Sequence, residues 1–294
     1  MHRSGEPIDT LLHVADLHFW KVVANPLRLL NKRFLGNLNV WLRRGRSFPM
    51  REAALFVEAL AATSANQVLL TGDFSSTSLD EEFALARRFV DALSDRGFAL
   101  NLMPGNHDVY TFEARHKRRF EYHFASYVPQ EGYPALRHLA GGTPLLLVPT
   151  VCPNWVSSKG RITRQETEQV GQLLDRLPPV VVVAGHYPLL EKTHGYELTR
   201  ERRLRNADAL RRVLGESGHT ILYVAGHVHR FSYTRDPEFP NLSHLSTGAF
   251  FHINRREHIR GEFARICVLA DGFEVHRHTL AESWSDAVRP PQSI

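Results

Sequence analysis

Five short motifs of acidic, amide and imidazole residues recur along the chain, each where an apolar run ends. They are Asp16-Leu17-His18, Gly72-Asp73, Gly105-Asn106-His107-Asp108, Gly185-His186 and Gly226-His227-Val228-His229. Carboxylate, amide oxygen and imidazole are ligands for hard or borderline divalent ions such as Mn, Fe(II), Zn or Mg. None of the motifs contains a cysteine, which argues against a thiolate-bound structural zinc. The motifs therefore predict a centre for divalent metal ions.

The number of candidate ligands indicates two ions rather than one. Seven side chains have ligand chemistry: Asp16, His18, Asp73, Asn106, His186, His227 and His229. Two ions that share a bridging carboxylate suit in-line displacement at phosphorus, because they hold the phosphoryl oxygens and lower the pKa of a water. His107 is left over beside the site. We expect it to protonate the leaving oxygen, with Asp108 fixing its tautomer.

Each motif taken alone has an ordinary structural interpretation. Gly-Asp is common turn chemistry, Gly-Asn-His-Asp could cap a helix, and Gly-His-x-His could be two histidines on a loop. Their joint occurrence, each directly after a strand-like run, favours a site, since ligands of open α/β sheets bind beyond the carboxyl ends of the strands.

Short apolar runs alternate with longer amphipathic stretches, a pattern typical of an α/β fold in one domain spanning residues 1–294. Strands are expected at Thr10–Ala15, Gln67–Thr71, Phe98–Met103, Pro144–Val148, Val180–Ala184 and Thr220–Ala225. Helices are expected at Asp80–Ser94, Thr163–Leu177 and Arg200–Glu216. The remainder predicts consecutive strands at His244–Phe250, Phe263–Ala270 and Phe273–Thr279, with a hairpin turn at Asp271–Gly272.

The charge of the chain is unevenly distributed. The 294 residues carry a formal net charge of +5, from 36 Lys and Arg against 31 Asp and Glu. Eight of the basic residues and no acidic residue lie in residues 19–51, so the rest of the chain carries 28 basic and 31 acidic residues. Bulk charge therefore gives no reason to expect nucleic-acid binding.

The chain shows no feature of an exported or membrane-spanning protein. Cys152 and Cys267 have no paired spacing, the first residues lack an apolar signal segment, and no apolar run approaches roughly 18 residues. We expect a cytoplasmic protein, and attachment to the inner face of the membrane remains open.

The five motifs, in this order from Asp16 to His229, resemble those of the calcineurin-like metallophosphoesterase superfamily. The resemblance implies a four-layer α/β/β/α sandwich with a dinuclear metal site at the carboxyl edge of the strands. Mn is the preferred metal, and Fe, Zn or Mg also fit. The resemblance implies this assignment of roles: Asp16, His18 and His229 on the first metal, Asn106, His186 and His227 on the second, Asp73 bridging, and His107 as leaving-group acid supported by Asp108.

The details of two motifs bear on the subfamily. Protein serine/threonine phosphatases of this superfamily carry G-D-x-x-D-R-G and G-N-H-E, whereas this chain has Gly72-Asp73-Phe74-Ser75-Ser76 and Gly105-Asn106-His107-Asp108. Double-strand-break nucleases usually add a capping domain, and only 65 residues follow His229. Class III cyclic-nucleotide phosphodiesterases have a similar length and remain an alternative.

The basic segment, at about residues 20–51, predicts an amphipathic helical insertion that begins at Asn25-Pro26. Its basic side chains oppose an apolar stripe formed by Leu27, Leu30, Phe34, Leu38 and Trp41. Such a segment suits an anionic membrane surface and acyl chains. The alternative is a helix that packs its stripe on the protein's own sheet.

With this insertion, residues 16–108 resemble bacterial UDP-2,3-diacylglucosamine pyrophosphatases, which make lipid X in lipid A synthesis. The preferred substrate is thus a nucleotide-diphosphate-linked lipid, hydrolysed to lipid X and UMP. The first alternative is a cyclic-nucleotide or general phosphodiesterase. The second is a membrane-surface protein with a structural metal site, which the presence of His107 disfavours because a structural site has no use for an acid.

Overall fold

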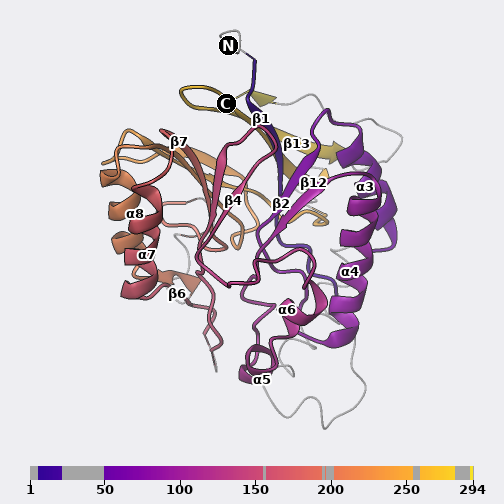
Figure 1. The fold of residues 1–294 in the computed structure, drawn as a ribbon. Coiled ribbons are helices and arrows are strands. Elements are labelled where there is room, and N and C mark those ends of the chain that lie inside the picture. The colour runs from indigo at the N-terminus through magenta and orange to yellow at the C-terminus, as the bar shows by residue number, and fades with distance from the viewer. Residues whose placement is uncertain are drawn as a thin grey trace.

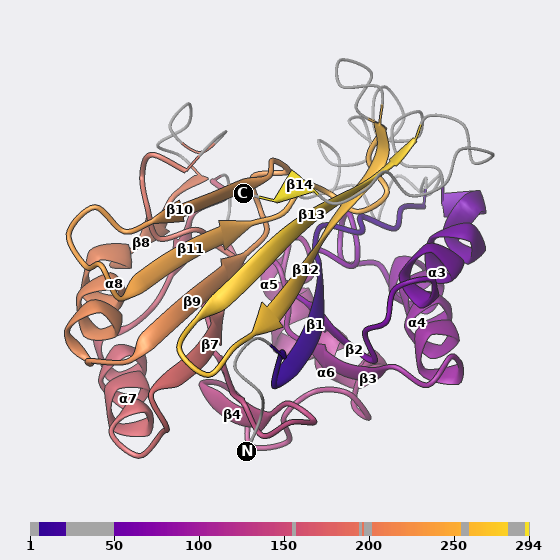
Figure 2. The same cartoon turned by 90° about the horizontal axis from the view of Figure 1, so that it is seen from above.

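The computed structural model describes residues 6–21, 50–154, 157–193, 196, 202–253, 259–281 and 292–293. Two six-stranded sheets lie between two pairs of helices, giving four layers (Figures 1 and 2). This confirms the expected α/β/β/α sandwich. Within the described ranges, no helix has both the length and the apolar character that crossing a bilayer requires.

The first sheet has the strand order β14-β13-β12-β1-β2-β3. Its strands are β1 (Asp9–Val14), β2 (Gln67–Leu70), β3 (Ala99–Leu102), β12 (Ile259–Val268), β13 (Phe273–Ala281) and β14 (Gln292–Ser293). The β1, β2 and β3 strands are parallel, whereas β12 and β13 run antiparallel to their neighbours. The carboxyl ends of β1, β2 and β3 therefore meet at one edge.

The second sheet has the order β10-β11-β9-β7-β5-β4. Its strands are β4 (Ala135–His138), β5 (Pro144–Leu147), β7 (Val180–Ala184), β9 (Thr220–Ala225), β10 (Ser232–Arg235) and β11 (Leu242–Ser246). The central four strands are parallel, and β4 and β10 close the two edges antiparallel. A separate pair, β6 (Gly160–Arg161) and β8 (Leu204–Arg205), is parallel.

Helices cover the outer face of each sheet. A single turn, η3 (Met50–Glu52), leads into α3 (Ala53–Ala61), which lies with α4 (Asp80–Asp95) over the first sheet. The second sheet is covered by α7 (Arg164–Leu174) and α8 (Ala207–Glu216). Two short helices, α5 (Phe112–His116) and α6 (Arg119–His123), follow the third motif.

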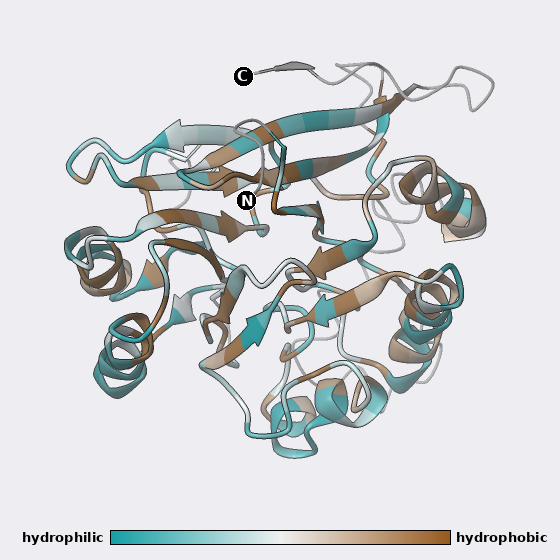
Figure 3. Ribbon diagram, turned by 45° about the horizontal axis from the view of Figure 1, so that its top comes forward, coloured by the Kyte–Doolittle hydropathy of each residue, from teal (hydrophilic) through white to brown (hydrophobic). Residues whose placement is uncertain are grey.

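Successive apolar residues of a strand point to opposite faces of its sheet and so fill three separate core layers. In β1, Leu12 packs in the layer under α3 and α4, whereas Leu11 packs between the sheets. In β7, Val181 and Val183 face α7 and α8, and Val182 faces the first sheet. The two-residue period of a strand thus explains why these runs are apolar throughout, as buried parallel strands require. Figure 3 shows hydrophobic residues along several of the inner strands, whereas other strands and the outer sides of the helices carry hydrophilic residues.

Several sequence predictions of secondary structure were wrong in their bounds, among them one helix and one strand. The helix expected from Arg200 begins at Ala207, because Leu204–Arg205 instead pair with Gly160–Arg161. The strand expected at His244–Phe250 ends at Ser246, since the chain then crosses to the first sheet, where the Phe250 amide donates to the Ala15 carbonyl at 3.0 Å. The helical insertion expected at about 20–51 falls mostly on residues 22–49, which lie outside the described residues.

Candidate metal centre

The five motifs converge at the carboxyl edge shared by β1, β2, β3, β7 and β9. His18 Nε2 lies 2.9 Å from His229 Nε2, so a residue after β1 meets one after β9. His229 Nε2 also lies 3.5 Å from Asp16 Oδ1. One ligand atom from each of Asp16, His18, Asp73 and His229 lies within 4.8 Å of the others. This first group brings together residues 211 positions apart in the chain.

A second group forms around the side-chain oxygen of Asn106. This Oδ1 atom lies 3.0 Å from His186 Nε2 and 2.9 Å from His227 Nδ1. Amide oxygen and two imidazoles are a suitable donor set for a divalent ion. All seven candidate ligands predicted from the sequence are therefore brought together, in two adjacent groups.

Asp73 lies between the groups and presents one oxygen to each. Its Oδ2 is 3.6 Å from His18 Nε2, and its Oδ1 is 3.5 Å from His186 Nε2. The main-chain amide of His107 donates to Oδ1 at 2.7 Å and thereby orients the carboxylate. A carboxylate held in this way has the geometry needed to bridge two ions.

Five of the seven candidate ligands have left-handed backbone conformations. Their φ angles are 55° for Asp16, 50° for His18, 56° for Asp73, 71° for His227 and 55° for His229. Residues other than glycine rarely adopt this region, and such conformations concentrate at functional sites. The tight turns direct these side chains to the sheet edge rather than along the strands.

Two glycines allow the loops to approach each other closely. A β-carbon at Gly72, which has φ 102°, would collide with the backbone of Gly105, and one at Gly105 would collide with Asp73. The glycines of the second and third motifs therefore bring Asp73 and Asn106 to the same point.

Main-chain carbonyls fix the orientation of two imidazoles. His186 Nδ1 is 2.8 Å from the Thr71 carbonyl oxygen, and His227 Nε2 is 2.9 Å from that of Arg202. Donation to these carbonyls leaves His186 Nε2 and His227 Nδ1, the atoms that face Asn106, as the metal-binding nitrogens. The Tyr187 ring lies over His227, with centroids 4.1 Å apart. Sequence reasoning missed Thr71 and Arg202 because any residue supplies a carbonyl.

The electrostatics of the site suit the binding of divalent cations. Burial lowers the pKa of His186 and depresses that of His227 further, which keeps both imidazoles neutral, as metal binding requires. Burial alone would raise the pKa of Asp16, but neighbouring imidazoles, His229 first, hold it below its usual value. Asp16 Oδ1 is buried and accepts no hydrogen bond. A buried anionic oxygen without a donor is costly unless a metal satisfies it, so the donors fit divalent ions.

The structure contradicts the role expected for Asp108. Its carboxylate accepts from the amides of Phe74 at 3.1 Å, Ser75 at 2.8 Å and Gly105 at 2.8 Å, and from the Ser75 hydroxyl at 3.0 Å. The His107 ring instead has Nδ1 2.6 Å from the Ser76 carbonyl oxygen. Asp108 therefore fixes the loops that carry Asp73 and His107, and does not set the tautomer of His107. Burial raises the pKa of Asp108 to about 6.

His107 itself lies beside the first group. Its ring packs edge-on against His18, with centroids 4.9 Å apart, and stacks on Tyr110 at 5.2 Å. This position is compatible with the acid role expected from the sequence. Tyr110, to which the sequence assigned no role, stacks on the ring.

A four-layer sandwich with two adjacent groups of nitrogen and oxygen donors defines a metal-dependent phosphoesterase class. A sequence model of the family described as Calcineurin-like phosphoesterase matches residues 10–231. The chain belongs to this family and is a hydrolase of phosphoester bonds with a dinuclear site for divalent metals.

Solved structures share the fold at low sequence identity. A dimetal phosphatase from Danio rerio has a TM-score of 0.61 at 12% identity, covering 98% of this chain and 100% of that chain. A purple acid phosphatase from yellow lupin seeds has 0.60 at 13%, covering 99% and 54%. A 5'-nucleotidase from Candida albicans has 0.50 at 14%, covering 97% and 57%, so this chain spans about half of the latter two. A search of curated proteins gave no match.

Proposed function

We propose that the protein hydrolyses a nucleotide-diphosphate-linked diacyl sugar, with Asp16, His18 and His229 on one ion, Asn106, His186 and His227 on the other, and Asp73 bridging. The observation that carries the two-metal assignment is Asp73, whose two oxygens face different ligand groups at 3.6 and 3.5 Å. The bound ions would polarise the phosphoryl oxygens and lower the pKa of an attacking water, with Mn our preferred metal.

The chain's own acid in this proposal is His107. Donation from Nδ1 to the Ser76 carbonyl, 2.6 Å away, leaves Nε2 as the nitrogen that exchanges a proton with substrate. Protonation of the leaving oxygen there removes the charge that develops as the P–O bond breaks. The Tyr110 ring stacked on His107 limits rotation of the imidazole. Asp108 holds the two supporting loops together by its four hydrogen bonds.

The lipid part of the proposal depends on the segment between Lys21 and Met50. The two ends that flank it lie together, since the Trp20 amide is 3.2 Å from Met50 Sδ. They also lie beside the metal loops, because Phe19 forms a bridge with Ser75. The described residues on either side of this segment therefore lie next to the site. A cytoplasmic enzyme acting at the inner membrane face needs basic and apolar residues there, and the sequence of this segment has both.

A substrate panel tests the proposal. The Mn-loaded protein should release UMP from UDP-2,3-diacylglucosamine in mixed micelles faster than it hydrolyses 3',5'-cyclic AMP or bis(p-nitrophenyl) phosphate. Faster hydrolysis of the cyclic nucleotide would favour the phosphodiesterase alternative. Bound metal without hydrolysis of any of the three would favour a structural metal site.

A further inference from the structure

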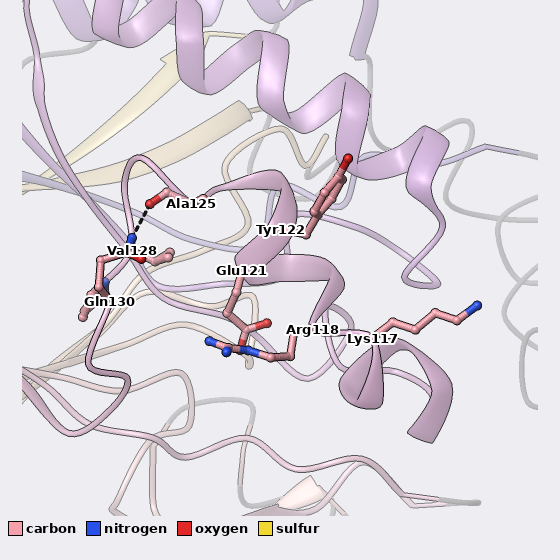
Figure 4. A pocket seen from close by; sticks show the side chains of 8 residues that line it. Lys117, Arg118, Glu121, Tyr122, Ala125, Val128 and Gln130 are labelled. Carbon is pink, nitrogen blue, oxygen red and sulfur yellow. Dashed lines mark hydrogen bonds between the residues drawn. The ribbon is translucent and has the colours of Figure 1, made fainter.

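A basic and partly apolar surface lies on α5 and α6, outside the metal centre. It consists of Lys117, Arg118 and Tyr122 around an open pocket of about 320 Å³, whose remaining lining includes Ala125, Val128 and Pro129 (Figure 4). We name these six residues the α5–α6 patch. Tyr122 is 79% exposed, and among the described residues only two other large hydrophobic side chains, Leu55 and Phe112, are exposed to solvent.

Part of the cationic charge of the patch has no ion-pair partner among the described residues. Residues 111–123 contain four Lys or Arg and two acidic residues. Within the described structure, Arg118 has no carboxylate within ion-pair distance, and Lys117 pairs only with Glu113 across an exposed 2.9 Å contact. Exposed pairs of this kind contribute little and can be exchanged for another anion. Glu121, which also lines the pocket, is engaged by Arg115 at 3.0 Å.

Hydrogen bonds connect α6 to the catalytic edge. Arg119 donates to the Ser78 carbonyl at 2.8 Å, and the Ser78 hydroxyl donates to the His107 carbonyl at 2.7 Å. The Tyr110 amide donates back to the same hydroxyl at 2.9 Å. Figure 1 shows α5 and α6 at the end of the molecule toward which β1 and β2 run. The α5–α6 patch therefore lies at the same end of the molecule as the loops that carry the metal ligands.

We infer that the α5–α6 patch binds the surface of an anionic phospholipid bilayer. Lys117 and Arg118 would meet headgroup phosphates, and Tyr122 has the amphipathic ring typical of the membrane interface. A purely basic surface would suit a nucleic acid equally well. The apolar residues Ala125, Val128 and Pro129 in the pocket lining distinguish the patch from such a surface. The inference rests on the proposed lipid substrate and deepens it, because it brings the enzyme to the layer that contains that substrate.

Vesicle sedimentation tests this inference without any substrate. The protein should bind vesicles of equal phosphatidylglycerol and phosphatidylcholine and should not bind phosphatidylcholine alone. Each basic residue near an anionic surface changes partitioning about fivefold, so Lys117→Glu with Arg118→Glu should weaken binding more than tenfold. Tyr122→Ser should weaken it severalfold with no change in charge. The control is Arg176→Glu with Arg212→Glu, two exposed positions at α7 and α8, which should match the wild type.

Hydrolysis of bis(p-nitrophenyl) phosphate should be retained by all three variants, which shows that they fold. Equal vesicle binding by the patch variant and the control would overturn the inference, as would no binding of anionic vesicles by the wild type. Binding of single-stranded RNA that depends on Lys117 and Arg118, with none to vesicles, would also overturn it. If patch-dependent vesicle binding is found but UDP-2,3-diacylglucosamine is not hydrolysed, the substrate proposal alone is wrong.

Discussion

Asp73 combines two constraints that few side chains could meet together. It occupies a left-handed backbone position with φ 56°, and its two oxygens face separate histidines. Aspartate tolerates this conformation better than most residues and also supplies the bridging charge. The residue type therefore follows from both the turn and the chemistry.

Replacing Asp73 by Asn should abolish tight binding of both ions. Asparagine keeps the tolerance for φ above zero, so the turn should survive, whereas the bridging charge is lost. Loss of residues that only support a metal ligand commonly costs 10- to 100-fold, so losing a bridging ligand should cost more than about 100-fold in rate. Metal analysis by mass spectrometry and turnover of bis(p-nitrophenyl) phosphate measure the two effects. A near-native rate with two bound ions would contradict the bridging role.

His107→Ala should lower the rate while leaving the metal content unchanged. General acids contribute roughly 10²- to 10⁴-fold, but only when the leaving group needs a proton. The loss should therefore be large for an alkyl phosphodiester and small for a p-nitrophenyl ester, whose leaving group departs as an anion. Equal losses for both substrates would argue against an acid role. Loss of the ions would instead identify His107 as a ligand.

At the scale of elements, the start of α4 connects the metal loop to the residues before position 22. The Glu82 carboxylate accepts from the amides of Thr77 at 2.7 Å, Leu79 at 3.3 Å and Lys21 at 3.2 Å. Burial raises the pKa of Glu82 to about 7, although these hydrogen bonds oppose the rise. One carboxylate thus secures the helix end, the loop after Asp73 and the chain leaving β1.

The elevated pKa of Glu82 makes stability depend on pH. The unfolded chain has the ordinary value near 4.5, so the folded state binds more protons between pH 4.5 and 7. The contribution of Glu82 to stability should be full below pH 4.5 and should fall as the pH rises to 7, by up to about 3 kcal/mol. Urea titrations of wild type and Glu82→Gln from pH 4.5 to 8 isolate this contribution. Parallel pH dependences for the two proteins would contradict it.

The sequence predicted the central elements because their periodicity and local signals agree. The strand runs at Gln67, Val180 and Thr220 and the helix at Asp80 each begin at the expected residue. The short strand at Leu204–Arg205 could not be predicted, because its only partner is Gly160–Arg161, more than 40 positions away. Pairing between distant segments leaves no local pattern in a two-residue strand.

The candidate metal ligands could be predicted from the sequence, whereas the groups that orient them could not. Imidazoles and carboxylates after strands are visible as residue types, whereas the carbonyls of Thr71 and Ser76 that orient His186 and His107 are not. The expected role of Asp108 rested on its place next to His107 in the sequence. The turn in which the Asp108 amide donates to the Gly105 carbonyl sends its carboxylate back to the 74–75 loop, away from His107.

At the scale of the whole molecule, the centre joins the two sheets. Asp16, His18, Asp73 and Asn106 follow strands of the first sheet, whereas His186, His227 and His229 follow strands of the second. Each proposed ion takes ligands from both sheets. The second sheet supplies His229 to the first ion and His186 to the second. The first sheet supplies Asp16 to the first ion and Asn106 to the second. The metal pair therefore acts across the interface that the central core layer also holds together.

Metal binding should consequently stabilise the whole fold in one transition. Ions bound at 100 times their dissociation constant add about 2.7 kcal/mol per site, since the unfolded chain does not assemble the ligands. At roughly 2–4 °C per kcal/mol, saturating Mn should raise the Tm by at least about 5 °C. Scanning calorimetry with Mn and with a chelator measures the shift, and Asp73→Asn serves as the control that should not respond. Two transitions, only one of them sensitive to Mn, would mean that the ions stabilise one sheet alone.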